Sequence, residues 1–315
     1  MVSNRARRPV MFEDFPKNEI EFDRRFRQEQ DCLDYLFSQR WPDGFVCPEC
    51  GHPHYWKSAR DLYRCRHCQK QVSVTTGTIF HGAKKSLILW FKALWWFSAR
   101  TSGVNAIALQ QLLGLGSYRT AWHWLQRLRT CTVFPDRQPL TGKVESDEFY
   151  LGGERSGKRG RGADHKCKVA VAVERQGKRL GRLRLSVIDD CSSAQLLPFV
   201  KAHVLSGSLV VTDGWKGYNG LERDFIHHRV LSSQAEEKES VLPGVHLVVS
   251  LVKRVILGTY QGRFNPEYLQ RYLDEYVFRF NRRTCAAPGK RFWRIMQQAV
   301  SLPPLTNRQL RFRTT

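Results

Sequence analysis

The chain has 315 residues, with 51 Lys and Arg against 29 Asp and Glu, and its formal net charge is +22. So large an excess of positive charge indicates a polyanionic partner, and nucleic acid is the first candidate; the alternative is a merely basic soluble protein. With 42% hydrophobic and 12% aromatic residues the chain can bury a core, which excludes a disordered basic tail, and its length allows two or three domains.

The first nine residues are polar and basic and contain no apolar run, so we expect no signal peptide. The most apolar stretch, Leu87 to Ala99, is interrupted by Lys92 and is too short to cross a bilayer. We therefore expect a cytoplasmic protein without a membrane partner. Five cysteines have no pairing pattern and are interpreted as ordinary reduced thiols: Cys32, Cys131, Cys167, Cys191 and Cys285.

Residues 19–40 alternate charged and apolar side chains and predict a helical lead-in, residues 1–41, which Trp41-Pro-Asp-Gly44 ends. Two C-x-x-C pairs follow, Cys47 with Cys50 and Cys65 with Cys68. Four thiolates at this spacing predict a tetrahedral structural Zn²⁺ site in a zinc ribbon, residues 42–81. A closed site of this kind is scaffold and not catalyst. Two disulfides or four unrelated buried thiols are the alternatives.

Residues 82–131 predict three helices. Apolar residues recur at helical spacing from Leu87 to Phe97, and Ser102-Gly103 ends that helix. A short helix over 105–113, a Gly114-Leu-Gly116 turn and a helix from Ser117 follow, which is the pattern of a helix-turn-helix. The last helix offers these side chains to DNA: Tyr118, Arg119, His123, Arg127 and Arg129. The alternative is a plain three-helix packing unit.

Beyond Pro139 the pattern changes to a mixed α/β domain, residues 140–300, before a basic tail, residues 301–315. The expected elements are strands over 144–151, 167–174 and 183–188, a helix over 193–204, and a strand over 209–212. Asp147 lies in the first strand, and Asp213 follows the last. If those strands are neighbours, the two carboxylates can bind Mg²⁺ together. Asp213-Gly214 also has the composition of an ordinary turn.

Four further stretches carry a resemblance to a known family. They are Lys143 to Gly153, Val211 to Tyr218, Ser250 to Tyr260 and Tyr272 to Arg283. Together with the cysteine pairs they resemble insertion-sequence transposases of the DDE superfamily, in the branch with an N-terminal zinc ribbon and an ISXO-like transposase domain. The resemblance implies a multidomain α+β protein: a zinc ribbon and helix-turn-helix followed by an RNase-H-like mixed α/β catalytic core.

The family pattern also implies site residues. Asp147 matches the first catalytic aspartate, in D-E-aromatic-x-x-G-G, and Asp213 matches the second, in T-D-G-aromatic. The third position is usually a Glu seven residues before the Lys of L-x-K-R; here that Lys is Lys253, and His246 stands at the third position. The resemblance thus implies Mg²⁺ or Mn²⁺ held by the two aspartates and His246, and a phosphate contact for Lys253.

Alternatives stay open for that last segment. His246 can instead be an ordinary core or surface histidine, and Lys253 a solvated charge. Seven residues put the two side chains about 20° apart on a helix, but the many β-branched residues from Val245 to Ile256 also suit a strand. Glu148 lies within a matching motif, and Glu275 can pair with Arg279 one turn later.

The function implied by the resemblance is DNA transposition: the protein binds the terminal inverted repeats of its element, cuts DNA by metal-assisted hydrolysis and joins the 3′ ends to target DNA. The implied partners are DNA and further copies of the chain, on the nucleoid. The basic stretch from Arg155 to Lys168 is interpreted as a loop on DNA phosphates or a solvated hairpin loop. The rival functions are a non-catalytic zinc-ribbon regulator derived from a transposase and a nuclease without strand transfer.

Overall fold

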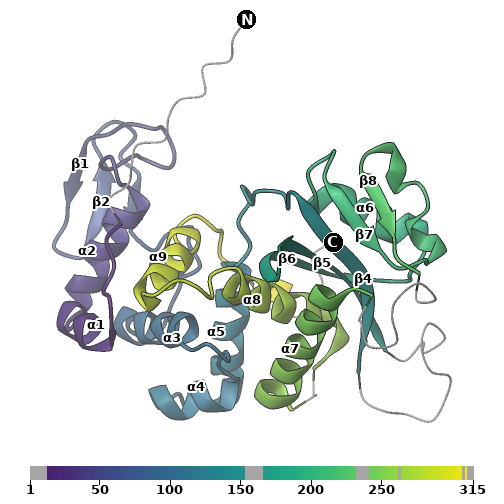
Figure 1. Ribbon diagram of the computed structural model, residues 1–315. Coiled ribbons are helices and arrows are strands. Elements are labelled where there is room, and N and C mark those ends of the chain that lie inside the picture. Colours follow the sequence, from purple (N-terminus) through teal and green to yellow (C-terminus); the bar gives the residue numbers. More distant parts are fainter. Residues whose placement is uncertain (1–12, 153–165, 232–240, 262–263, 307–308, 311–315) are drawn as a thin grey trace, which may run out of the picture.

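The computed structural model describes residues 13–152, 166–231, 241–261, 264–306 and 309–310. Figure 1 places the small sheet of the N-terminal region at one end of the molecule and a larger sheet at the other, with helices from both ends of the chain between them. No helix in these described segments is long and apolar enough to cross a membrane. The basic stretch 155–165 lies outside the described residues.

The expected lead-in consists of two helices, α1 (Glu19–Arg25) and α2 (Glu29–Arg40). The first ends at Phe26, which leaves the helical conformation. The second begins with a capping box, in which the side chain of Gln28 accepts from the third peptide N–H and Asp31 reaches back to the backbone of Gln28. The pattern of charged and apolar residues correctly predicted helix over most of residues 19–40. It did not predict the break between Phe26 and Gln28, where the capping box starts a second helix.

The next unit is a three-stranded antiparallel sheet of β1 (Tyr55–Lys57), β2 (Leu62–Cys65) and β3 (Gln71–Ser73). One face of this sheet packs on α2 through aromatic rings. The Tyr63 ring centroid lies 5.0 Å from that of Phe37 and 5.6 Å from that of Trp41. The other face is left to solvent and carries Trp56, which is 49% exposed.

Three helices follow, α3 (Leu87–Ala99), α4 (Ala106–Leu113) and α5 (Tyr118–Thr130). Their starts agree with the sequence: Asn105 caps α4 by accepting from Ala108 N–H, and Ser117 caps α5 by accepting from Thr120 N–H. Gly114 ends α4 in the left-handed region, at φ 60°, which suits glycine. A helix from the far end of the chain, α9 (Pro288–Ala299), packs into the same hydrophobic cluster.

The larger sheet has five strands in the order β6-β5-β4-β7-β8. The strands are β4 (Lys143–Leu151), β5 (Cys167–Gln176), β6 (Arg179–Ile188), β7 (Leu209–Thr212) and β8 (Ile226–Arg229). The β4–β5 and β5–β6 pairs are antiparallel, whereas β4–β7 and β7–β8 are parallel. This mixed sheet is consistent with an RNase-H-like core. Strand β8, Ile-His-His-Arg at the sheet edge, has no apolar alternation and was not predicted.

Helices cover both faces of this sheet. On one face, α6 (Ser193–His203) packs through Leu196 and Val200 against Val144. On the other, α7 (Pro243–Tyr260) and α8 (Leu269–Phe280) share a cluster with Phe149 and Val211. Alternate residues of β4 therefore face different helices, as the period of a strand requires. This assigns odd-numbered β4 residues, Asp147 among them, to the side of α7.

A buried ion pair joins α5 to α8. Arg129 Nε donates to Glu275 Oε2 at 2.8 Å, and the two side chains are 1% and 3% exposed. Burial acts to raise the pKa of Glu275, but the charges of Arg129 and Arg279 outweigh it, so the pKa is lowered. The expected pairing of Glu275 with Arg279 is confirmed at 2.7 Å. The expectation that Arg129 faces DNA is wrong, because this guanidinium neutralises a buried carboxylate.

Candidate functional site

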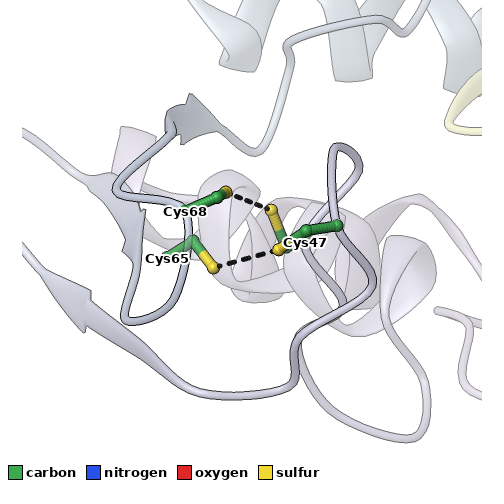
Figure 2. A group of neighbouring side chains, drawn as sticks. Cys47, Cys65 and Cys68 are labelled. Carbon is green, nitrogen blue, oxygen red and sulfur yellow. Dashed lines mark hydrogen bonds between the residues drawn. The ribbon is translucent and has the colours of Figure 1, made fainter.

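The four cysteines come together as their spacing predicts. Every pair of their sulfur atoms lies within 4.8 Å, and in Figure 2 the sulfurs of the labelled Cys47, Cys65 and Cys68 lie close to one another. Cys47 Sγ is 3.6 Å from Cys68 Sγ, and Cys50 Sγ is 3.6 Å from Cys65 Sγ. These separations exceed the ~2.05 Å of a disulfide and match the ~3.8 Å edge of a tetrahedral zinc–thiolate site.

The local backbone explains how two short turns present four sulfurs. In the first turn Gly51 N–H donates to Cys47 C=O at 2.9 Å, and Gly51 has φ +73°. In the second, Gln69 takes the same left-handed conformation, φ +64°, directly after Cys68. In each turn the chain thus reverses direction at the residue after the second cysteine, which has a positive φ. Glycine adopts this conformation without cost, whereas Gln69 is strained in it. The donor set and its geometry support a structural zinc and exclude the disulfide alternative.

Asp147 lies on β4, and Asp213 directly follows β7, the strand next to it in the sheet. The parallel β4–β7 ladder pairs Glu145 with Val211, and continuing this register by two residues brings Asp147 level with Asp213. Both side chains are partly buried. Across the other edge of β4, Asp147 pairs with Val171. The condition set by the sequence, that the two strands be neighbours, is therefore met.

A buried tyrosine contacts Glu148 on the side of the sheet that α6 covers. Burial raises the pKa of Tyr218 well above its usual range, and the negative charges of Glu148, Asp147 and Asp213 act in the same direction. Tyr218 is 0% exposed, and its hydroxyl donates to Glu148 Oε2 at 3.5 Å. The sequence motif contained Tyr218 but gave it no role, because its burial depends on the packing of α6.

The loop after β7 is held by its own motif. Asp213 Oδ1 accepts from Trp215 N–H at 3.0 Å, and the Trp215 indole donates to Cys191 C=O at 2.7 Å. A Cβ on Gly217 would lie 2.6 Å from both that carbonyl oxygen and the indole nitrogen. Gly217 is therefore required for the indole to reach Cys191. Asp213 therefore does form a turn, as its composition with Gly214 suggested, because its carboxylate accepts from the peptide N–H two residues ahead.

His246 and Lys253 lie on a helix, α7, which decides between the helix and strand interpretations. Its buried stripe is Val245, Val248, Val252 and Ile256. His246 and Lys253 are both exposed beside that stripe. Among the described residues only the cysteine quartet forms a tight group of three or more ligating side chains. The structure brings Asp147 and Asp213 to one level of the sheet, but does not join His246 to them in such a group.

One residue near the site was overlooked in the sequence. Glu145 precedes Asp147 by two positions on β4, is buried, and contacts the first turn of α7 through Gly244 N–H at 2.7 Å. The available signal was an acidic residue two positions before Asp147, which places both on the same face of the predicted strand.

Comparison with known proteins gives matches in both halves of the chain. Residues 139–281 match the model of the ISXO2-like transposase domain, and residues 27–71 match that of the transposase zinc-ribbon domain. One relative is described as an "Uncharacterized protein in transposable element ISH50" from Halobacterium salinarum. It is 25% identical over 218 residues, covering 63% of this chain and 72% of the relative. The cysteine quartet lies within the first matched region and the five-stranded mixed sheet within the second, so the chain combines an N-terminal transposase zinc ribbon with an ISXO2-like DDE transposase domain.

Proposed function

We propose that this transposase binds the ends of its insertion sequence, cuts the DNA by metal-assisted hydrolysis and joins the freed 3′ ends to target DNA. The observation that carries the proposal is the β4–β7 register, which brings Asp147 level with Asp213. Those are the two positions that match catalytic aspartates in the family. The alternative of a non-catalytic DNA-binding regulator is favoured by one feature, the histidine at the third position.

The residues present fit a divalent ion. Asp147 and Asp213 offer carboxylate oxygens and His246 an imidazole, a donor set that suits Mn²⁺ and, through the carboxylates, Mg²⁺. Mg²⁺ or Mn²⁺ bound there supplies Lewis-acid assistance to cleavage of the phosphodiester. The buried Tyr218 keeps its proton and donates to Glu148, the neighbour of Asp147 that faces α6, so it holds this part of β4 from the other side of the sheet. Lys253, exposed on α7, is available to contact the phosphate next to the scissile bond.

The test is incubation of the zinc-loaded protein with a labelled element end and Mg²⁺ or Mn²⁺. Cut and joined products are expected. Binding without cleavage would favour the regulator, and cleavage without joining would favour a stand-alone nuclease. A transposase must bring two element ends together, so we also expect the active form to be a multimer on nucleoid DNA.

The role of His246 makes a separate prediction. Replacing it with alanine removes one ligand, and we expect cleavage to fall by about a hundredfold. His246→Glu should recover part of that loss, because glutamate is the usual residue at this position. The wild type should be more active with Mn²⁺ than with Mg²⁺, since imidazole prefers the softer ion. Cleavage rates of the three proteins with each metal check this.

The control is Ser250→Ala, one turn further along the exposed side of α7. Wild-type cleavage in His246→Ala would show that His246 is a bystander. The nearest upstream acids, Glu236, Glu237 and Glu239, would then be the next ligand candidates; they lie outside the described residues.

The outer face of the zinc ribbon is suited to bind DNA. Trp56 and Arg64 are directly opposite each other in the β1–β2 ladder, so they share one face, and Arg64 is opposite Gln71 in the β2–β3 ladder. The Arg66 guanidinium lies 5.3 Å from the centre of the Trp56 ring. An exposed aromatic ring between two guanidinium groups combines phosphate binding with a surface for stacking. We propose that this face, with the α4–α5 helix-turn-helix and its exposed Tyr118 and Arg119, holds the element ends.

Substitutions on this face are expected to weaken end binding in two distinguishable ways. Arg64→Gln and Arg66→Gln each remove a phosphate contact, so each should reduce the slope of log K against log salt by about 1. Trp56→Ala should weaken binding by about tenfold with little change in that slope. Affinity measured over a series of salt concentrations checks both.

The matched control is Lys57→Gln. Lys57 is the neighbour of Trp56 on β1, but it points to the other face and pairs with Asp61 at 2.9 Å. It should bind DNA like the wild type. If Lys57→Gln and Arg66→Gln lose affinity equally, the effect is one of general charge and the outer face is not the interface.

A further inference from the structure

The first turn of α7 is capped by a residue from the sheet. Its N-cap residue, Leu242, makes no side-chain hydrogen bond to the helix. Instead, Gly244 N–H and Val245 N–H both donate to Oε2 of Glu145, at 2.7 and 3.0 Å. These are the second and third peptide groups of the helix, which a Ser or Asp at the N-cap would normally satisfy. A carboxylate in this place also interacts favourably with the positive end of the helix dipole.

The second oxygen of the Glu145 carboxylate also has a partner. Its Oε1 forms an ion pair with Arg175 on β5, 3.2 Å from Nε, and the Glu145 side chain is only 4% exposed. With Oε2 bound to two peptide N–H groups and Oε1 paired with Arg175, Glu145 is unsuited to be a metal ligand itself.

Gly244 makes the contact possible. A Cβ at this position would lie 2.8 Å from Glu145 Oε2 and 2.8 Å from Arg175 Cδ. Any larger residue would have to displace the carboxylate or the side chain of Arg175. The contact thus depends on three residues from two strands and a helix, which the tertiary structure brings together.

Glu145 lies close in the structure to the elements that carry the proposed metal ligands. Glu145 and Asp147 are alternate residues of β4, so both point to the side that α7 covers. Glu145 is also paired with Val211, two residues before Asp213. On the helix, the capped Val245 is followed directly by His246. One carboxylate therefore links the strand of Asp147, the strand leading to Asp213 and the turn that carries His246.

We propose that Glu145 is a positioning residue, whose carboxylate fixes the first turn of α7, and with it His246, relative to Asp147 and Asp213. The inference rests on the proposed function, because it presumes that these three side chains hold the metal. Without the carboxylate, two peptide N–H groups and the Arg175 guanidinium lose their buried acceptor. The helix end then moves, and ligands must be held to within about 0.5 Å for metal binding.

The test is Glu145→Gln in the full-length, zinc-loaded protein. Glutamine keeps the shape but loses the charge and turns an N–H₂ group toward other donors. We expect the dissociation constant for Mn²⁺, measured by electron paramagnetic resonance, to rise about tenfold. Hydrogen exchange should become faster at residues 244–246. DNA end binding without divalent metal should be unchanged. Gly244→Ala, which leaves Glu145 in place but blocks its approach, should give the same changes.

The matched control is Glu174→Gln. Glu174 is also a buried carboxylate in this sheet; it accepts from Thr141 N–H and Arg182 N–H, both at 2.8 Å, and its side chain is 5% exposed. It is opposite Val144 in the β4–β5 ladder, on the side of the sheet that α6 covers, and its hydrogen bonds to Thr141 and Arg182 do not involve α7. We expect a comparable loss of thermal stability, with Mn²⁺ affinity and exchange in α7 unchanged.

Two outcomes would overturn the role of Glu145. One is an unchanged Mn²⁺ affinity in Glu145→Gln while Asp147→Asn weakens it, because the metal site would then not depend on the cap. The other is an equal loss of Mn²⁺ affinity in Glu145→Gln and Glu174→Gln, because the effect would then be one of general destabilisation. Wild-type Mn²⁺ affinity in Asp147→Asn would instead refute the ligand assignment of the proposed function, and this inference with it.

Discussion

Asp147→Asn and Asp213→Asn are each expected to lower DNA cleavage by on the order of a thousandfold while leaving the binding of element ends intact. Each change removes one anionic oxygen from the proposed metal site and keeps the size of the side chain. The Asx turn at position 213 should survive, because an asparagine oxygen can still accept from Trp215 N–H. Cleavage and gel-shift assays on the same preparations separate the two effects.

The chain offers a control for the possibility that Asp213 is only a turn residue. Asp190 is the second residue after β6, where Asp213 is the first after β7, and its Oδ1 likewise accepts from the N–H two residues ahead, that of Ser192, at 2.8 Å. Asp190→Asn should therefore cleave at the wild-type rate. If Asp213→Asn matches Asp190→Asn in cleavage, Asp213 merely shapes a turn and the active site is misplaced.

Removal of the zinc site is expected to have the second large effect. Metal analysis should find about one zinc per chain, and Cys50→Ser should lose it. Zinc binding to such a site contributes about 10–16 kcal/mol to folding at neutral pH, far more than the small aromatic cluster around Tyr63 can supply. We therefore expect residues 42–80 to unfold locally. The α/β domain should stay folded, because its two hydrophobic clusters contain no residue of the ribbon.

Hydrogen exchange resolved along the chain checks this. Fast exchange should be confined to the ribbon and to the part of α2 that packs on it, near Phe37 and Trp41. Cys285→Ser, a partly buried cysteine outside the quartet, should keep both the zinc and the protection. A chelated, metal-free protein that remains fully protected over 42–80 would refute a structural zinc.

The helices and strands of this chain followed from local signals where those signals were strong. Helices were predicted to begin at Asn105 and Ser117, and in the structure both residues are N-caps, a position that Asn and Ser favour. The strand 209–212 was predicted with its observed bounds, since four apolar or β-branched residues end at Asp-Gly. Strand β8 was missed because an edge strand of Ile-His-His-Arg owes its state to pairing with β7 and not to its own pattern.

The DNA-facing role of Arg129 shows where a helical pattern misleads. Periodicity separates apolar from polar residues, so it places every arginine of a helix on the solvent side. It cannot see that Glu275, 146 residues later, supplies a buried carboxylate at 2.8 Å. Tyr118 and Arg119, near the start of the same helix, are exposed as predicted.

The sequence by itself determined the zinc ribbon, the family resemblance and the residues to test. Cysteine spacing specifies metal geometry within two short turns, and motif residues can be matched one by one without knowing the fold. Only the tertiary structure decided that the β4–β7 register, continued by two residues, brings Asp147 level with Asp213, that the buried Tyr218 donates to Glu148, and that Glu145 caps α7. These relations join residues that are 66 to 100 positions apart. They depend on strand order, register and helix docking, which the burial of the whole core fixes and no local pattern encodes.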